Sequence, residues 1–209
     1  MQKIAAGCLG IILVIFVIVV ITAIGSYNGL VSSSQAVDKK WADVQAVYQR
    51  RADLIPNLVS TVAGAANFEK STLIAVTDAR ASVGQVKIDP NQAPSDPEQL
   101  AKYQAAQSQV SSALSRLLVV AENYPNLKAS ANFQDLQTQL ESTENRISVA
   151  RQDFNDAVQT YNTKIKGFPM VFVAGGLGFS PKPYFAADAG AQSAPKVNFD
   201  FSGSAAPAH

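Results

Sequence analysis

A long apolar run near the N-terminus is the feature that most constrains this chain of 209 residues. From Ile4 to Ile24 the sequence reads IAAGCLGIILVIFVIVVITAI, without a charged residue. A helix of that length, rising about 1.5 Å per residue, crosses a hydrocarbon core of about 30 Å, so the run predicts a membrane-spanning helix. A cleaved signal peptide is the alternative, because residues 23–25 resemble a cleavage site, but the apolar part of a signal covers only about 7–15 residues.

The basic residues around the apolar run indicate how the helix is oriented across the membrane. Lys3 precedes it, and no Lys or Arg lies between Gly25 and Val37 to hold that stretch in the cytoplasm. This asymmetry favours an N-terminus in the cytoplasm and a main domain on the outer side of the membrane.

Composition excludes several classes of function. The net charge is +1, and the dispersed Lys and Arg residues form no basic stripe that would follow a phosphate backbone, so we expect no nucleic-acid partner. The single cysteine, Cys8, lies inside the apolar run, which rules out an intrachain disulfide or a Cys-rich zinc site.

Apolar and small residues recur after the span at alternating steps of three and four residues. The pattern covers Leu30–Val62, Leu100–Tyr124 and Phe133–Tyr161. Such heptad seams predict long helices that each bury one stripe against the others. The expected fold is therefore all-α, an N-terminal transmembrane helix followed by an antiparallel bundle of long, coiled-coil-like helices.

Prolines divide this pattern. The stretch VKIDPNQAPSDPEQ, residues 86–99, cannot form one helix, and its Asp96, Pro97 and Gln99 predict an N-cap, a first-turn residue and a capping partner. The tripeptide Pro-Asn-Leu occurs twice, at Pro56 and Pro125. We expect a kink at Pro56 and a turn at Pro125 with Ser130 capping the last helix.

If the two halves run antiparallel and both rise about 1.5 Å per residue, residues that lie side by side have numbers that add to roughly 180. Pro56 and Pro125 would then lie at one level.

The sequence changes character after Lys166. An apolar stretch at 170–179, which contains Phe172 and Phe179, could pack across the end of the bundle, insert into lipid or meet a neighbouring subunit. From Ala186 the chain is of low complexity except for APKVNFDF. The expected division is a cytoplasmic end and span at 1–26, a helical bundle at 27–166, and an apolar loop with a tail at 167–209.

Several motifs resemble the LemA family. They are RRADLIPNLV at 50–59, TDARA at 77–81, ENYPNLK at 122–128 and TENRI at 143–147, followed by NDAV, YNT and FP. The resemblance covers about Tyr27 to Phe179, with a further match at Pro195, Val197 and Phe199. It implies a bacterial single-pass protein of the cytoplasmic membrane with a helical bundle and no established enzymatic activity. Phe68 stands where the family pattern suggests a histidine.

No catalytic constellation is visible in the sequence. The one histidine is His209, the last residue, and no phosphate-binding Gly-x-x-x-x-Gly-Lys occurs. Gly175, Gly176 and Gly178 do not stand between a strand and a helix. We therefore predict no enzyme activity and no cofactor.

Charged residues at the edges of the seams are the remaining site candidates. They are Arg50, Arg51, Asp53, Glu122, Glu144, Arg146 and Arg151. They could form a polar binding groove or, as we favour, an interhelical network that fixes helix register, since a buried Arg needs a partner. A metal site of Glu69, Glu122 and Glu144 would lack the Glu-x-x-His pairs of di-metal bundles.

The function that we expect is a self-associating, membrane-tethered scaffold, a homo-oligomer that organises a membrane or envelope structure. The alternative is a sensory or regulatory accessory module that binds a protein partner or small ligand.

Overall fold

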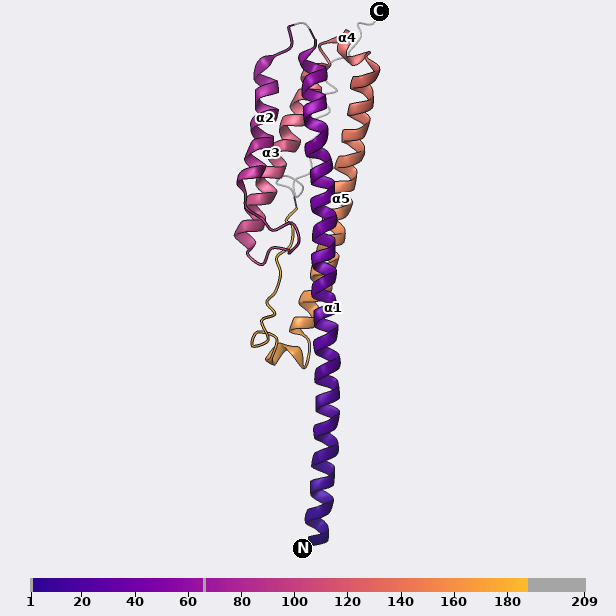
Figure 1. Ribbon diagram of the computed structural model, residues 1–209, viewed down its shortest axis with the longest axis vertical. Helices are drawn as coiled ribbons and strands as arrows, with labels where there is room; N and C mark the ends of the chain where they lie inside the picture. The colour runs from indigo at the N-terminus through magenta and orange to yellow at the C-terminus, as the bar shows by residue number, and fades with distance from the viewer. Residues whose placement is uncertain (1, 66, 188–209) are drawn as a thin grey trace, which may run out of the picture.

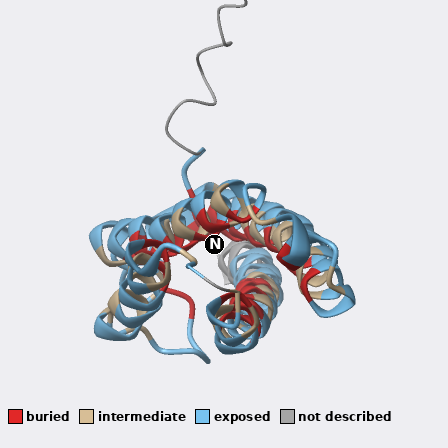
Figure 2. Cartoon of the chain, turned by 90° about the horizontal axis from the view of Figure 1, so that it is seen from above, coloured by how far each residue is buried: buried red, intermediate tan, exposed pale blue. Residues whose placement is uncertain are grey.

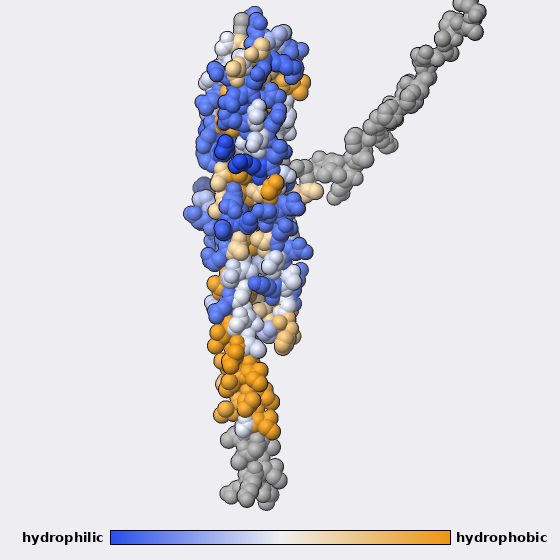
Figure 3. Space-filling model, turned by 90° about the vertical axis from the view of Figure 1, so that its right-hand side faces the viewer, coloured by the Kyte–Doolittle hydropathy of each residue, from blue (hydrophilic) through white to orange (hydrophobic). Residues whose placement is uncertain are grey.

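The first helix dominates the molecule. The structure, a computed structural model, describes residues 2–65 and 67–187, and its helix α1, Gln2–Ala63, runs for 62 residues without a break (Figure 1). The apolar side chains from Ile11 to Ile24 project beyond the bundle and are exposed, as the orange part of the stalk in Figure 3 shows. By length and composition, this is the one helix of the described chain that could cross a membrane.

Four further α-helices and one 3-10 turn form the bundle around the upper part of α1. They are α2 (Lys70–Gln85), α3 (Pro97–Ala121), α4 (Pro125–Lys128), α5 (Ala131–Lys166) and the turn η1 (Met170–Phe172). Helix α5 packs antiparallel along α1, and α2 pairs with α3 beside them (Figure 1). The described chain contains helices and no strands, which confirms the predicted all-α class.

The predicted seams supply most of the core. Nearly all of the seam positions between Leu30 and Val62 are buried, as are the positions from Leu100 to Ala121 and most of those from Phe133 to Tyr161. The buried residues line the inward sides of the helices in Figure 2. They form a lower aromatic cluster around Trp41 and Phe154, and an upper aliphatic cluster around Leu58 and Leu117.

Helix α2 was not predicted as a separate element. Its buried stripe is short, with only Thr72 and Val76 fully covered, and this gives a weak periodic signal.

The predicted caps are mostly present. Asp96 accepts a hydrogen bond from the Glu98 backbone N–H, and Pro97 is the first residue of α3. Gln99 is not the capping partner, since its side-chain amide donates to the Lys87 carbonyl at 2.8 Å and ties α3 to the preceding loop. Ser130 caps α5 by accepting from the Phe133 N–H, as predicted.

Pro56 lies inside α1 and does not end it. A proline has no N–H, so it leaves the carbonyl four residues earlier, that of Ala52, without its helical donor. Arg80 of α2 fills this gap, with its Nε 3.2 Å from the Ala52 oxygen. The two most distinctive motifs of the sequence, at 50–59 and 77–81, therefore meet at the carbonyl that the proline releases.

Pro56 and Pro125 do not lie at one level. The α1–α5 register pairs Lys40 with Asp153 and Arg51 with Glu144, so the paired numbers add to 193 and 195. Pro125 begins the short helix α4 and lines a depression beside Thr61, beyond the level of Pro56. The assumption of a sum near 180 was wrong because α1 ends at Ala63 and the chain returns as α2, so that α1 pairs with α5 while only α2 pairs with α3 across the 86–99 loop.

The core continues past residue 166, where we expected the bundle to end. Met170, Ala174 and Phe185 are buried in the lower cluster. The motif APKVNFDF and His209 lie outside the described residues.

Candidate functional site

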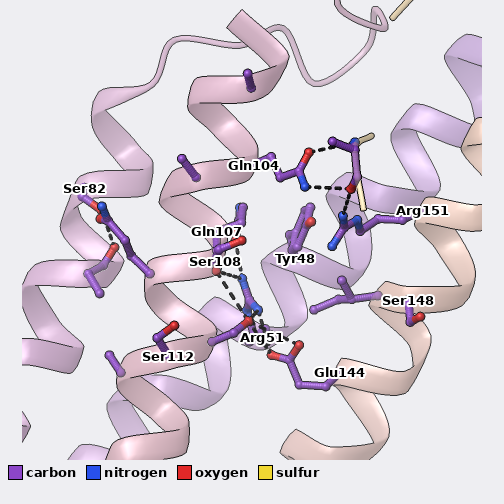
Figure 4. Close-up of a pocket in the computed structure, with 18 of the residues that line it drawn as sticks. Tyr48, Arg51, Ser82, Gln104, Gln107, Ser108, Ser112, Glu144, Ser148 and Arg151 are labelled. Atoms are coloured by element: carbon purple, nitrogen blue, oxygen red, sulfur yellow. Dashed lines mark hydrogen bonds and ion pairs between the residues drawn. The ribbon is translucent and has the colours of Figure 1, made fainter. Parts of the chain in front are cut away.

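A buried arginine joins three helices in the middle of the bundle. Arg51 of α1 is only 2% exposed, and its Nη1 lies 2.7 Å from Glu144 Oε1 of α5 and 2.6 Å from Ser111 Oγ of α3. Its Nη2 donates to the backbone and side-chain oxygens of Gln107, also on α3 (Figure 4). The guanidinium therefore has an ionic partner and several neutral acceptors, which a buried charge requires.

Tyr48 covers one side of this arginine. The Arg51 guanidinium carbon lies 5.2 Å from the centre of the Tyr48 ring, a cation–π arrangement. Burial raises the pKa of Tyr48 to about 12, although Arg151 and Arg51 oppose this effect. The phenol therefore stays neutral throughout the physiological range.

The network forms the floor of a groove between α3 and α5. The groove has a volume of about 1250 Å³ and opens to solvent. Figure 4 shows the side chains that line it, most of them small or amidic. The lining includes Ala101, Ala105, Ser108 and Ser112 from α3, Ser148 and Arg151 from α5, and Ala186 and Ala187 at one end.

Side-chain amides hold an extended segment at that end of the groove. Asn162 and Asn155, two helical turns apart on α5, each make two hydrogen bonds to the backbone, of Lys182 at 2.9 and 2.9 Å and of Phe185 at 3.1 and 2.9 Å. Gln104 of α3 does the same with Ala186, at 2.9 and 3.1 Å. The paired bonds satisfy the peptide groups as a neighbouring strand would. We call these three residues the amide clamp.

Two side chains of the clamped segment enter the bundle. The Lys182 ammonium lies 2.7 Å from Asp38 Oδ1 and 5.7 Å from the centre of the Tyr161 ring. Phe185 is 4% exposed and contacts the rings of Trp41 and Phe154, with centroids 6.1 and 5.4 Å away. An ion pair and an aromatic contact thus fix the register of this segment on α1 and α5.

The structure brings only some of the predicted site residues together. Arg51 and Glu144 form one ion pair, and Arg151 lies on the same groove, with Nη2 2.9 Å from the Ala186 oxygen. Arg50 and Asp53 are on the surface of α1, and Asp53 accepts a hydrogen bond from Gln49.

The other two charged candidates lie away from the groove. Glu122 pairs with Lys128 near the upper end of the bundle, and Arg146 lies on the outer surface of α5.

Sequence reasoning missed the amide clamp. Asn155 and Asn162 stand seven residues apart, which places them on one face of α5, and this spacing was an available signal. Polar side chains at seam edges were read as potential ionic partners, and amides that bind backbone were not considered.

The apolar stretch that follows α5 is partly buried and partly exposed. Phe179 packs its ring against Tyr27 of α1, with centroids 5.8 Å apart, and the Lys164 ammonium lies 3.1 Å from the Gly29 oxygen. Phe168 and Phe172 are 86% and 80% exposed. These contacts place the exposed rings at the level where the apolar part of α1 ends.

Among the side chains that the structure describes, those of residues 10–65 and 67–187, no group of three or more His, Cys, Asp or Glu is placed to hold a metal ion. Glu69, Glu122 and Glu144 therefore do not form a shared site.

Comparison with known proteins gives one family and several relatives. The sequence model of the LemA family matches residues 40–199. Magnetosome proteins MamQ 1 and MamQ 2 of Paramagnetospirillum magneticum are each 29% identical over 205 residues, covering 88% of this chain and 75% of theirs. Protein LemA of Metamycoplasma hominis is 26% identical over 145 residues, covering 69% of this chain and 62% of its own.

Proposed function

The chain belongs to the LemA family, and from that premise we propose that it is a non-catalytic scaffold, anchored in the bacterial cytoplasmic membrane, that associates with copies of itself. The bundle stands on the outer side of the membrane in this proposal. The relatives named as magnetosome proteins support a membrane-associated role.

The observation that carries the proposal is the continuity of α1 from the apolar span into the bundle. Because no loop interrupts this helix, every copy in one membrane holds its bundle at the same height and presents the same faces sideways. Anchoring in one membrane also raises the effective concentration of the copies relative to one another. Lateral association then needs only a modest contact.

The outer face of the α1–α5 pair offers such a contact. Val149 is exposed in a shallow depression that is also lined by Asp43, Glu141, Arg146 and Asp153. A two-fold contact uses the same patch on both copies, so a patch that carries both signs of charge can complement itself.

The exposed rings of Phe168 and Phe172 fit the membrane interface. Lys166 lies exposed at the end of α5 beside them, where a long basic side chain can reach lipid headgroups. We assign this end of the bundle to the lipid surface, as a second contact that holds the bundle upright.

Cysteine crosslinking in membranes tests self-association. In a Cys8→Ser background, a single cysteine at Val149 should give crosslinked dimers, because each copy supplies one thiol to the two-fold contact. Ser148→Cys is the matched control, because its neighbouring position faces the groove and not the outer surface. Monomers alone at both positions, with full labelling of the thiols, would refute the scaffold.

The groove between α3 and α5 supports one alternative, an accessory module that binds a protein partner or small ligand. Its volume and its Arg51–Glu144 floor would suit a polar segment. Glu144→Gln should then abolish retention of a stoichiometric partner in affinity purification, whereas Glu141→Gln, on the outer surface, should not. The absence of any partner from the unmodified chain would remove this alternative.

A further inference from the structure

The segment that the amide clamp holds has a second copy in the sequence. Residues 181–185 read Pro-Lys-Pro-Tyr-Phe, and residues 195–199 read Pro-Lys-Val-Asn-Phe. The proline, the lysine and the phenylalanine recur at the same spacing. The two positions that differ are 183 and 184.

Two of the three repeated positions are the ones that the bundle recognises; Pro181, the third, is exposed. Lys182 pairs with Asp38, and Phe185 fills the aromatic contact with Trp41 and Phe154. Lys196 and Phe199 repeat these two anchors.

The positions that differ carry little of the recognition. Tyr184 is 46% exposed, so an asparagine at the matching position, Asn198, gives up only a partly covered ring. Pro183, which is partly buried, is matched by another apolar residue, Val197. The clamp residues Asn155 and Asn162 bind only main-chain groups of the segment, which any sequence without a proline at the donating position supplies. The N–H groups that donate to Asn162 and Asn155 belong to Lys182 and Phe185, and the matching residues of the second copy, Lys196 and Phe199, are not prolines.

We propose that residues 195–199 of one copy occupy this site in a neighbouring copy, in place of that copy's residues 181–185. This inference rests on the proposed self-association and names a contact for it. The incoming segment would make the same ion pair, aromatic contact and amide hydrogen bonds as the segment that it replaces. The exchange therefore costs little free energy. Repetition from copy to copy would link bundles in series.

The chain has the reach that this exchange needs. Residues 186–194 separate the two motifs, and an extended stretch of that length covers about 30 Å. This is comparable to the width of a small helical bundle, whose helices lie about 8–10 Å apart. Copies in the same membrane meet at the same height, which favours exchange between copies over exchange in free solution.

Site-specific photocrosslinking of the full chain in its membrane tests the proposal. Benzoylphenylalanine replaces Phe199, and two copies with tags of different size are expressed together. We expect crosslinks between the two tagged copies, mapped by mass spectrometry to the peptides that contain Trp41 or Phe154. Benzoylphenylalanine at Phe201, outside the motif, is the control and should give at least fivefold less of this product.

Two variants sharpen the result. Lys196→Glu places an acid opposite Asp38 and should lower the crosslink at least fivefold. Phe185→Ala weakens the resident segment and should raise it, if the bundle keeps its helical circular dichroism. Crosslinks at the level of the Phe201 control, or crosslinks confined to one copy, would overturn the exchange. If the Val149 cysteines still give crosslinked dimers in that case, the scaffold stands and only the tail contact is refuted.

Discussion

Removal of the Glu144 carboxylate should leave Arg51 as a buried cation without an ionic partner. Breaking a buried ion pair from one side costs about 3–5 kcal/mol. Two features of the site lower this figure. The Glu144 side chain is 40% exposed, so water shares the solvation of the pair, and Ser111 and Gln107 continue to accept from the guanidinium.

We therefore expect Glu144→Ala to lower the free energy of unfolding by about 2 kcal/mol. For a bundle of this size that corresponds to a fall of about 4–8 °C in Tm. Arg51→Met should cost less, about 1 kcal/mol, because it removes the buried charge together with its need for a partner. The double variant should then show a coupling energy of about 1.5 kcal/mol.

Thermal and chemical unfolding of the full chain in mild detergent measures these values. The chain has a single tryptophan, Trp41, which is fully buried in the bundle and reports its unfolding by fluorescence. Glu141→Ala on the exposed surface of α5 is the control and should stay within about 0.5 kcal/mol of the parent chain. A Glu144→Ala variant as stable as this control would refute the reasoning that the pair holds three helices together.

Three further outcomes follow from the same contacts. Phe172→Trp in a Trp41→Phe background should be quenched by lipids brominated near the headgroup, and unchanged emission would contradict lipid contact at this end of the bundle. Arg80→Ala should destabilise the bundle by about 1 kcal/mol, but by much less in a Pro56→Ala chain, where a backbone N–H again serves the Ala52 carbonyl; equal costs in both chains, measured by denaturation, would contradict that role. The pKa of Tyr48 is raised to about 12 in the folded chain, so the neutral phenol contributes up to about 2.7 kcal/mol to the free energy of unfolding. This contribution is complete below pH ~10 and is lost as the pH rises towards ~12. Tyr48→Phe should therefore flatten the stability–pH curve between these values, and an unchanged slope would refute this explanation.

The sequence predicted the elements that have long apolar periods. The seams that begin at Leu30, Leu100 and Phe133 correspond to α1, α3 and α5, and the caps at Asp96 and Ser130 were placed correctly. Apolar periodicity and helix capping depend on residues that are close together in the sequence, so both can be recognised in a single sequence. The short helix α2 was missed for the same reason, because its buried stripe is too brief to establish a period.

The candidate site was predicted only in part. Arg51 and Glu144 were recognised as charged residues on seam edges, but pairing them requires the register between α1 and α5, which the loop lengths determine. The amide clamp depends on a segment that returns along α5 about twenty residues after Asn162. No periodic signal marks such a return, since the partner of each amide is a peptide group that any residue carries.

The unbroken helix α1 also acts as a lever. Its 39 residues from Gly25 to Ala63 raise the far end of the bundle about 58 Å above the end of the apolar span, at about 1.5 Å per residue. A change of 20° in the tilt of the span, which is within the usual range for membrane helices, would carry that end sideways by about 20 Å. Bilayer thickness and curvature would therefore set the spacing between distant bundle tips, and a neighbour that holds the tips would in turn fix the angle of the helix in the lipid.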